Sequence, residues 1–562
     1  MMWRRTRRVD PEIAPEEIFL DSTNVSAFDQ ARFEGRIEKP LSQQTFVGLF
    51  TVLGLMLVVL VGRSWHLQVA KGAALATQSA ENSLEAVTLF APRGVITDMH
   101  GVVLAENVEK EDGTVIRSYP YPSLSHAIGY VTYPKKDARG IYYSTSQTGV
   151  SGLEAEYDAL LAGQNGQILI ETDALGKVRS QGSIVPPIGG KNIALSIDAR
   201  LQELFDQAVA DVARSSRFIA GGGVILDVES GAVRALVSYP SYDSNVMASG
   251  EPASTISSYN TDIGRPFLDH AIQGMYVPGS IVKPLVAAGA LTDGIITTRT
   301  IIDDPGVISI DDPYNPGKTY RYTGWKELGR VDVKDAIAWS SDIFFYTVGG
   351  GFKNQKGLGI DRLGYWYRAF GLGSTTGIDI SGEAAGLVPT PRWKKETFNE
   401  SWYLGDTYFT AIGQYAMQVT PIQMARAIAA VANGGKLLIP TLLAGKTPTW
   451  AHVPVDLEQL AVVRAGMRQT VTSALAGAIN FPYISVAAKT GTAQIGTRNQ
   501  YDNSWLVGFF PYEHPRYAFA VVLERGPEGV GSRAVNVMAE LFNALHAENS
   551  PYVGGTATST PR

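Results

Sequence analysis

The 562-residue sequence contains no cysteine. This absence excludes disulfide bonds, zinc sites built from thiolates and catalysis by a thiol nucleophile. The net charge is only -6, and no basic run carries interleaved aromatic residues, so the composition does not indicate nucleic-acid binding. The seven histidines are scattered without the short spacing of metal ligands. We therefore expect neither a bound metal nor another cofactor.

One long apolar run is present near the N-terminus, and it carries no charge from Phe46 to Gly62. Its length of 17 residues corresponds to about 25 Å of helix, near the short limit for crossing a membrane. A cleaved signal peptide is the alternative, but its apolar core would measure about 7–15 residues behind a short basic leader. More than forty residues precede this run. We predict an uncleaved membrane anchor over residues 45–62, after a cytoplasmic tail of residues 1–44.

Beyond the anchor, the pattern changes twice. Residues 63–215 alternate short β-like runs with Gly and Pro turns, which predicts a β-rich, elongated pedestal domain. Residues 216–546 begin and end with candidate β-hairpins and hold helical runs between them, one of them over Val333–Val348. This order predicts an α+β domain in which helices sandwich one antiparallel sheet. We expect residues 547–562 to form a disordered tail.

Three short motifs follow one another in the second domain. They are Ser280-Ile281-Val282-Lys283, Ser340-Ser341-Asp342 and Lys489-Thr490-Gly491-Thr492. Each is common by chance, but their local contexts fit a serine acyl-transfer site. Ser280 opens an apolar helical stretch with Pro284 in its first turn, where proline is tolerated, and Lys489 ends a β-rich run.

The spacing of these residues has a chemical explanation. On a helix, residues three apart share a face, so Lys283 is expected beside Ser280, where it can take the serine proton. A lysine acts as a base near pH 7 only if its pKa falls by roughly three units from about 10.4, which burial and a second cation, Lys489, would favour. Ser340 would relay protons between the two lysines and the leaving amine. The amides of Ser280 and Thr492 are the expected oxyanion hole.

The motifs resemble those of the class B penicillin-binding proteins, the membrane-anchored D,D-transpeptidases that crosslink peptidoglycan. The likeness extends to the hairpin Gly223–Asp227 and Ala232–Pro240, and to Arg93–Asp98 and Gly149–Glu154 in the pedestal. Most members of the family carry Asn where this chain has Asp342. The stretch Ser341-Asp342-Ile343-Phe344-Phe345-Tyr346 is similar to the elongation (rod-shape) branch.

The resemblance implies the fold, the reaction and the partners. It implies five catalytic residues, Ser280, Lys283, Ser340, Asp342 and Lys489, and three substrate-binding residues, Thr490, Gly491 and Thr492. Asp342 would contact the substrate amide or position Lys283. The implied substrates are stem peptides ending in D-Ala-D-Ala on lipid-linked or nascent glycan, and β-lactams would acylate the same serine. The family also implies a catalytic domain outside the cytoplasm and a glycan polymerase of the SEDS type as partner.

Alternatives stay open at this point. A D,D-carboxypeptidase or a serine β-lactamase would use the same three motifs, a non-catalytic scaffold would keep only the fold, and a penicillin sensor would need a signalling domain. Tyr320 and Trp325 are candidates for a wall of the substrate groove. We interpret His270 as structural and four acidic residues as solvated loop charges or turn residues. These four are Asp303, Asp304, Asp311 and Asp312.

Overall fold

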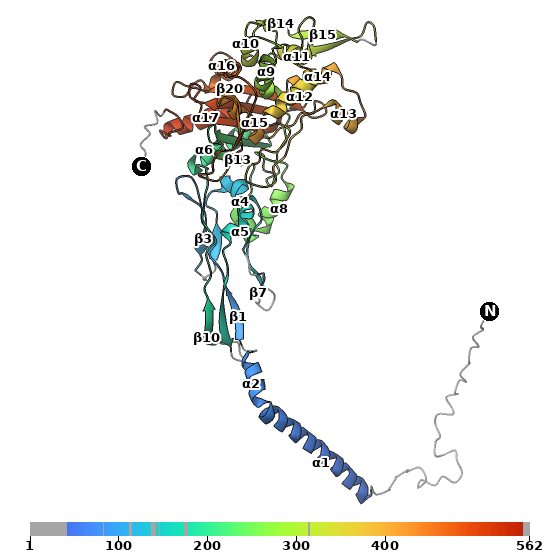
Figure 1. Cartoon of the computed structure of the whole chain (residues 1–562), viewed down its shortest axis with the longest axis vertical. Helices are drawn as coiled ribbons and strands as arrows, with labels where there is room; N and C mark the ends of the chain where they lie inside the picture. Colours follow the sequence, from blue (N-terminus) through green and yellow to red (C-terminus); the bar gives the residue numbers. More distant parts are fainter. Residues whose placement is uncertain are drawn as a thin grey trace, which may run out of the picture. The chain divides into compact units, whose positions relative to one another are not determined.

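The computed structural model describes residues 42–81, 84–111, 115–136, 142–144, 147–172, 178–312 and 315–554 (Figure 1). The chain divides into two compact units: residues Met1–Glu85 with Ile170–Gln181, and Ala86–Leu169 with Gly182–Arg562. Almost all of the predicted cytoplasmic tail lies outside the described residues.

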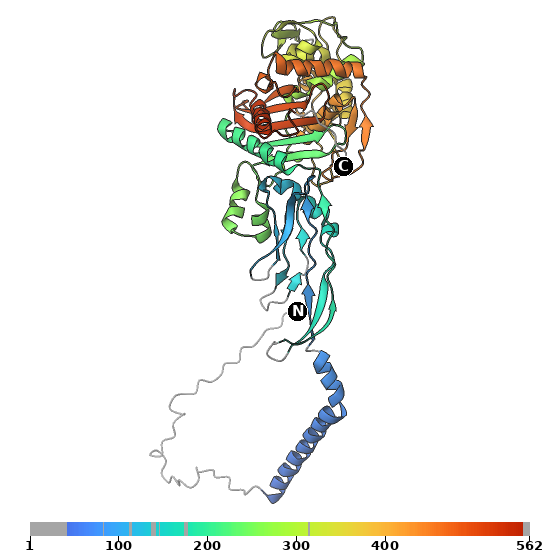
Figure 2. The same ribbon diagram turned by 90° about the vertical axis from the view of Figure 1, so that its left-hand side faces the viewer.

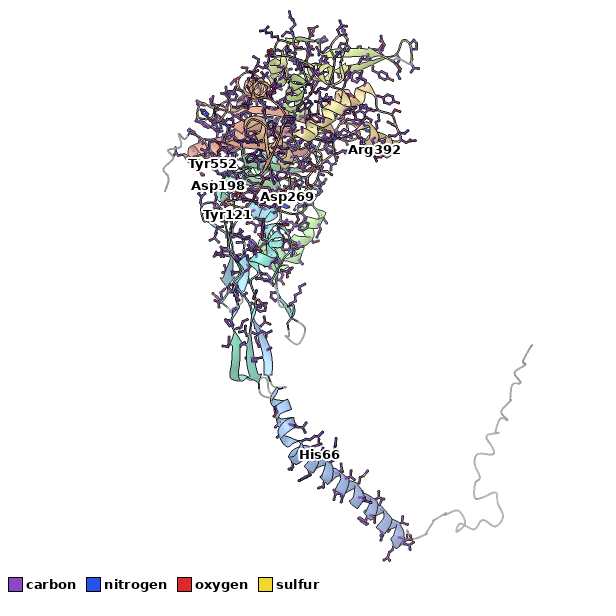
Figure 3. The ribbon with its side chains drawn as sticks, viewed as in Figure 1. His66, Tyr121, Asp198, Asp269, Arg392 and Tyr552 are labelled. Atoms are coloured by element: carbon purple, nitrogen blue, oxygen red, sulfur yellow. The ribbon has the colours of Figure 1, made fainter. Side chains whose placement is uncertain are left out.

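The first unit is dominated by an exposed apolar helix. Helix α1 (Gln43–Trp65) begins at Ser42, whose side chain accepts a hydrogen bond from Thr45 N, and continues into the π-helical turn η3 (His66–Ala70). Figure 3 labels His66 on this helix. By length and composition, the 28 residues Gln43–Ala70 are sufficient to cross a membrane. The helix extends beyond the predicted residues 45–62 at both ends, because the polar residues that flank an apolar run can still be helical. Helix α2 (Gly72–Glu81) follows.

The region predicted as a pedestal is β-rich. One sheet has the order β1 (Leu84–Leu89), β9 (Gly166–Thr172), β10 (Val178–Val185), and a second has the order β11 (Ile193–Ala194), β2 (Ile96–Thr97), β3 (Val103–Glu109), β4 (Val115–Ser118). Two small ladders pair β5 (Val131–Thr132) with β8 (Thr148–Gly149) and β6 (Lys135–Lys136) with β7 (Tyr142–Ser144). The short helices are η4 (Pro122–Leu124), α3 (Ser125–Ile128), α4 (Gly152–Glu156) and α5 (Asp158–Leu161).

A buried ion cluster explains two of the pedestal motifs. Glu154 is fully buried and accepts hydrogen bonds from Arg93 Nε at 2.5 Å and from Arg117 Nε at 2.8 Å. A buried carboxylate between two arginines is compensated in charge, whereas loss of either partner would leave an unpaired charge in the interior.

The second domain is built on one antiparallel sheet, as predicted. Its strand order is β13 (Val233–Tyr239), β12 (Ala220–Asp227), β22 (Tyr517–Pro527), β21 (Tyr501–Phe510), β20 (Ala487–Ile495). Alternate residues enter two different apolar cores, with Trp505 and Val507 in one and Leu506 in the other. Helices α6 (Ala199–Ser216) and α17 (Ala534–Ala547) cover one face, and α15 (Pro421–Ala432) covers the other (Figures 1 and 2). Strand β20 lies at the edge of the sheet.

The remaining elements surround this sheet. The helices are α7 (Ser244–Ser249), α8 (Ala253–Thr261), η5 (Gly279–Val282), α9 (Lys283–Thr292), α10 (Val333–Ala338), α11 (Asp342–Gly350), α12 (Gly359–Ala369), α13 (Pro391–Phe398), α14 (Leu404–Ala411), α16 (Leu457–Thr472) and η6 (Gly477–Ile479). The short strands pair as β14 (Ile302–Asp304) with β17 (Gly329–Val331), β15 (Val307–Asp311) with β16 (Thr319–Thr323), and β18 (Lys436–Leu438) with β19 (Trp450–His452).

Two predictions require correction here. The helical run over Val333–Val348 is two helices, α10 and α11, which are separated at Trp339–Ser341. The predicted disordered tail begins too early, because Tyr552 and Val553 are buried in the core under α17. Tyr552 Oη donates a hydrogen bond to Asp198 Oδ2 at 3.1 Å, and Figure 3 labels both residues.

Candidate active site

Ser280 lies in the short helix η5, immediately before α9. Gly279 has a φ of 59°, and its N–H donates to Gly413 O at 2.8 Å. Trp505 Nε1 donates to Val277 O at 3.0 Å. These bonds fix the turn that carries the nucleophile. Pro284 occupies the first turn of α9, as predicted.

Lys283 is fully buried, and its ammonium group is held by the second motif. Nζ donates to Ser340 O at 2.8 Å, to Ser340 Oγ at 3.2 Å and to Asp342 Oδ1 at 2.6 Å. Burial lowers the pKa of Lys283, and the Asp342 carboxylate partly opposes that shift. The structure therefore brings the first two motifs into direct contact, with Asp342 positioning the lysine.

Ser340 lies at the break between α10 and α11, with a φ of 58° that is uncommon for a residue with a side chain. Ser341 is the N-cap of α11, and its hydroxyl accepts a hydrogen bond from Phe344 N at 3.0 Å. Trp325 Nε1 donates to Trp339 O at 3.0 Å. The capping preference of serine explains why the helix restarts here, and the break turns Ser340 toward Lys283.

Asp304 contacts the second motif, although the sequence predicted a solvated charge or a turn residue. It is buried on β14, not solvated, and accepts a short hydrogen bond from Ser341 Oγ. Burial raises the pKa of Asp304. Asp312 is buried as well, where it accepts a hydrogen bond from Asn315 N, so it is not solvated either. Asp303, the neighbour of Asp304, is exposed as predicted. The alternation of a strand separates the two residues, and the sequence shows no sign of which one points inward.

The third motif lies on the edge strand β20. Lys489 is fully buried, and its Nζ donates to Thr490 O at 2.9 Å. Burial, reinforced by repulsion from Lys283, sets the pKa of Lys489 well below its usual value. The two lysines thus lie close enough to influence each other, as predicted.

All three motifs meet at one pocket of about 870 Å³. Ser280, Ser340, Asp342, Thr490 and Thr492 all line it. The other lining residues are Thr323, Gly324, Trp325, Tyr346, Phe409, Ile412, Gln414, Tyr415, Leu475, Gly491, Gln494, Asn499, Asp502, Glu528, Gly529, Gly531 and Ser532. The volume is typical of a ligand site.

Of the two residues predicted to wall the substrate groove, only Trp325 does so, and His270 is structural as predicted. Trp325 lines the pocket, whereas Tyr320 does not and instead donates a hydrogen bond to Asp312 Oδ2 at 3.2 Å. His270 is buried, with Nδ1 2.5 Å from Tyr276 Oη and Nε2 2.9 Å from Gly264 O, so both ring nitrogens have structural partners. Among the described residues, no group of three or more His, Cys, Asp or Glu could hold a metal ion.

Comparison with protein families assigns the two domains. Residues 221–545 match the Penicillin binding protein transpeptidase domain, and residues 110–195 match the Penicillin-binding Protein dimerisation domain. The peptidoglycan D,D-transpeptidase MrdA of Escherichia coli K12 is 34% identical over 468 residues, which cover 76% of this chain and 71% of the relative. The peptidoglycan D,D-transpeptidase FtsI of the same organism is 25% identical over 443 residues, which cover 76% of this chain and 66% of FtsI.

Solved structures of other penicillin-binding proteins are also similar to this chain. PBP2 of Pseudomonas aeruginosa in complex with WCK 5153 has a TM-score of 0.69 and 31% identity, covering 85% of this chain and all of that one. PBP2 of Helicobacter pylori in complex with MreC has a TM-score of 0.69 and 26% identity, covering 83% of this chain and 99% of that one. A chain from a peptidoglycan synthase complex that coordinates polymerization and crosslinking has a TM-score of 0.70 and 27% identity. The match covers 92% of this chain and all of that one.

The transpeptidase match covers more than half of the chain, and the identity to MrdA exceeds the identity to FtsI. The chain therefore belongs to the class B penicillin-binding proteins, in their elongation branch.

Proposed function

We propose that this protein is a peptidoglycan D,D-transpeptidase that crosslinks stem peptides during cell-wall elongation. The observation that carries the proposal is the convergence of the three motifs on one pocket, where the buried Lys283 contacts Ser340 and Asp342 beside Ser280. The family and the MrdA relatives support the same reaction.

In the first step, Ser280 Oγ attacks the carbonyl carbon of the penultimate D-Ala. Lys283, in its neutral form, takes the hydroxyl proton, since burial favours that form. The amides of Ser280 and Thr492 stabilise the oxyanion, a contribution of about 10²–10³ in rate for each donor. The peptide bond breaks, the proton passes through Ser340 to the leaving amine, and free D-Ala departs.

In the second step, the side-chain amine of another stem peptide attacks the acyl-enzyme. Its proton returns through the same lysine and serine to Ser280 Oγ as the ester bond breaks. One amide bond is formed for one broken, so the reaction needs no energy source. Asp342 accepts a hydrogen bond from Lys283 Nζ and so keeps this nitrogen in place while it takes and releases the proton.

The C-terminal carboxylate of the donor peptide binds beside Lys489. Thr490 and Thr492 supply hydroxyl donors at the pocket wall, with Gly491 between them, and the bound carboxylate favours the protonated form of the lysine behind them. β-Lactams carry a carboxylate and a reactive carbonyl in a similar arrangement. They therefore acylate the same serine.

The helix Gln43–Ala70 anchors the protein in the membrane, with the catalytic domain on the extracytoplasmic side. A glycan polymerase of the SEDS type is the proposed partner. The structural likeness to a chain of a synthase complex that coordinates polymerization with crosslinking supports this partner, and the likeness to PBP2 bound to MreC supports a scaffold contact.

The first test is mass spectrometry of the full-length protein in detergent with benzylpenicillin, followed by peptide mapping. We expect one stable adduct on Ser280, and none in Ser280→Ala. An adduct on the Ser280→Ala variant would refute the assignment of the nucleophile, and a folded wild type without any adduct would favour the scaffold alternative. Product analysis with an added acceptor amine then separates a transpeptidase from a D,D-carboxypeptidase, which transfers the acyl group to water.

A further inference from the structure

The active-site pocket has an acidic end. Along β20, Gln494 lies four residues beyond Thr490 and opposite Asp502, and Glu528 precedes the glycine that binds Asp502; all four residues line the pocket. Trp325, Tyr346 and Phe409 add aromatic rings to the lining. No Lys or Arg occurs among the described residues that line the pocket, because Lys283 and Lys489 are fully buried behind it. Asp342 is paired with Lys283. The open part of the pocket is therefore negatively charged at its Asp502 end.

Asp502 has an unused hydrogen-bond acceptor. It lies on β21 opposite Gln494 of the edge strand β20, and only 3% of its surface is exposed. Its Oδ2 accepts a hydrogen bond from Gly529 N at 2.8 Å, but its Oδ1 has no partner among the described residues. Burial and the neighbouring Glu528 raise the pKa of this carboxyl group. A buried polar atom without a partner is costly, so such an atom beside a ligand pocket indicates a partner supplied by the ligand.

Glu528 strengthens the negative charge at this end. It is exposed in the loop between β22 and α17, next to the glycine that binds Asp502. Among the described residues, no salt bridge involves Asp502 or Glu528. The nearby Arg525 guanidinium lies over the Tyr501 ring, 5.1 Å from its centre. Neither carboxylate is therefore paired with a cation of the described residues.

The distance along β20 fits a stem peptide. An extended peptide can bind along the exposed edge of a sheet, and β20 is such an edge. Thr490 and Gln494 are four residues apart, or about 13 Å. If the terminal carboxylate of an extended peptide binds at Thr490, the residue two positions before the C-terminal residue lies about 7 Å from Thr490 along β20. A lysine-like side chain covers most of the remaining distance.

We infer that Asp502 and Glu528 form a subsite for the side-chain ammonium group of a stem peptide. This inference rests on the proposed transpeptidase function, and it identifies how the enzyme recognises the diamino residue of its substrate. A metal ion fits the subsite poorly, since two carboxylates provide too few ligands and no larger group of metal-binding residues occurs among those described. The ammonium belongs either to the donor peptide or to an acceptor peptide that docks here before its amine loses a proton and moves to the acyl carbon, and the experiment below separates the two.

The donor arm uses two synthetic pentapeptides that end in D-Ala-D-Ala and differ only in the side chain of the third residue, a free amine or its N-acetyl form. Release of D-Ala by the full-length protein in detergent gives kcat/KM for each. We expect the wild type to prefer the free amine by about tenfold or more. Asp502→Asn keeps an acceptor for Gly529 N, and together with Glu528→Gln it should reduce this preference to nearly one, with little change for the acetylated peptide.

The acceptor arm keeps the donor acetylated and supplies a second peptide with a free amine. If the subsite binds the acceptor, the variants should form about tenfold less crosslinked product than the wild type, at an unchanged rate of donor cleavage. A loss in either arm supports the ammonium subsite and identifies its source. Unchanged donor preference and unchanged crosslinking in both single variants and in the double variant would overturn it.

Controls separate the possible failures. Glu458→Gln removes one carboxylate from α16, outside the pocket, and should retain the wild-type ratios. The exposed Glu528 can be replaced without disturbing the core. If Asp502→Asn does not fold, the Glu528→Gln variant alone therefore still tests the subsite. If the wild type releases D-Ala from neither peptide, the proposed function fails. If it cleaves both peptides equally and transfers normally in every variant, only the subsite fails.

Discussion

Lys283 Nζ lies 2.6 Å from Asp342 Oδ1, in a pair where the lysine is fully buried and the aspartate borders the substrate pocket. The contact joins the first motif to the residue at which this chain departs from the commoner Asn of its family. The carboxylate raises the pKa of Lys283 against the larger effect of burial. Asp342 therefore affects the pH at which the lysine can act as a base.

This relationship predicts the pH dependence of Asp342→Asn. Acylation of Ser280 should rise with pH as Lys283 loses its proton. Asparagine removes the charge that favours the protonated lysine, so the rising limb should move to lower pH, by about one unit or more. The rate of acylation by benzylpenicillin between pH 5 and 10 measures the shift. An unchanged profile, or a shift to higher pH, would contradict the assignment of Lys283 as the base.

Lys489→Met should abolish acylation and yet stabilise the fold. The folded-state pKa of Lys489 is well below its unfolded value, so the unfolded state binds more protons between the two pKa values. Wild-type stability therefore falls as pH decreases through that window and is constant below it. The stability advantage of Lys489→Met should grow as pH is lowered from about 10 and should then become constant, reaching about 1–2 kcal/mol in unfolding free energy at neutral pH, and the Tm difference should follow it. Equal Tm values at every pH would contradict the prediction.

Gly413 supports the turn that carries the nucleophile. Its φ is 72°, and a Cβ added there would lie 2.2 Å from Gly279 O. Gly413→Ala should therefore displace Ser280 and reduce acylation by about a hundredfold, the effect of a misplacement near 1 Å. Gly250→Ala is the matched control, since Gly250 has a φ of 74° but no atom within 4 Å of an added Cβ. Equal acylation rates for the two variants would show that the contact with Gly279 is unimportant.

Ser341→Ala should weaken the start of α11. The variant loses the N-cap bond to Phe344 N and leaves the buried Asp304 carboxylate without its hydroxyl partner. We expect a loss of about 2–3 kcal/mol in unfolding free energy, together with slower acylation, because Ser340 and Asp342 flank this residue. Asp304→Asn should recover part of the stability when it is added to Ser341→Ala. A double variant less stable than the single variant would contradict the role of Asp304.

Tyr552 should contribute to stability and not to catalysis. Its hydroxyl donates to Asp198 Oδ2, the carboxylate that caps α6. Tyr552→Phe should cost about 1 kcal/mol, and truncation after residue 547 should cost more because buried apolar contacts are also lost. Both changes should lower the Tm and leave the acylation rate at 20 °C unchanged. An unaltered Tm after truncation would show that the segment does not stabilise the core.

The sequence by itself determined the reaction class, the three motifs, the apolar helix and the antiparallel sheet between helices. It could do so because helix starts, apolar runs and alternating strands are local patterns. Ser280 at a helix start and Pro284 in the first turn follow from such rules.

Only the tertiary structure decided the contacts between these segments. The break of the predicted helix at Ser340 depends on Ser341, which caps the next helix and binds Asp304 from a distant strand. The burial of Asp304 and Tyr552, and the unpaired oxygen of Asp502, likewise depend on which face of an element meets the core. Burial and long-range hydrogen bonding arise from packing between distant segments, so no local pattern could have indicated them.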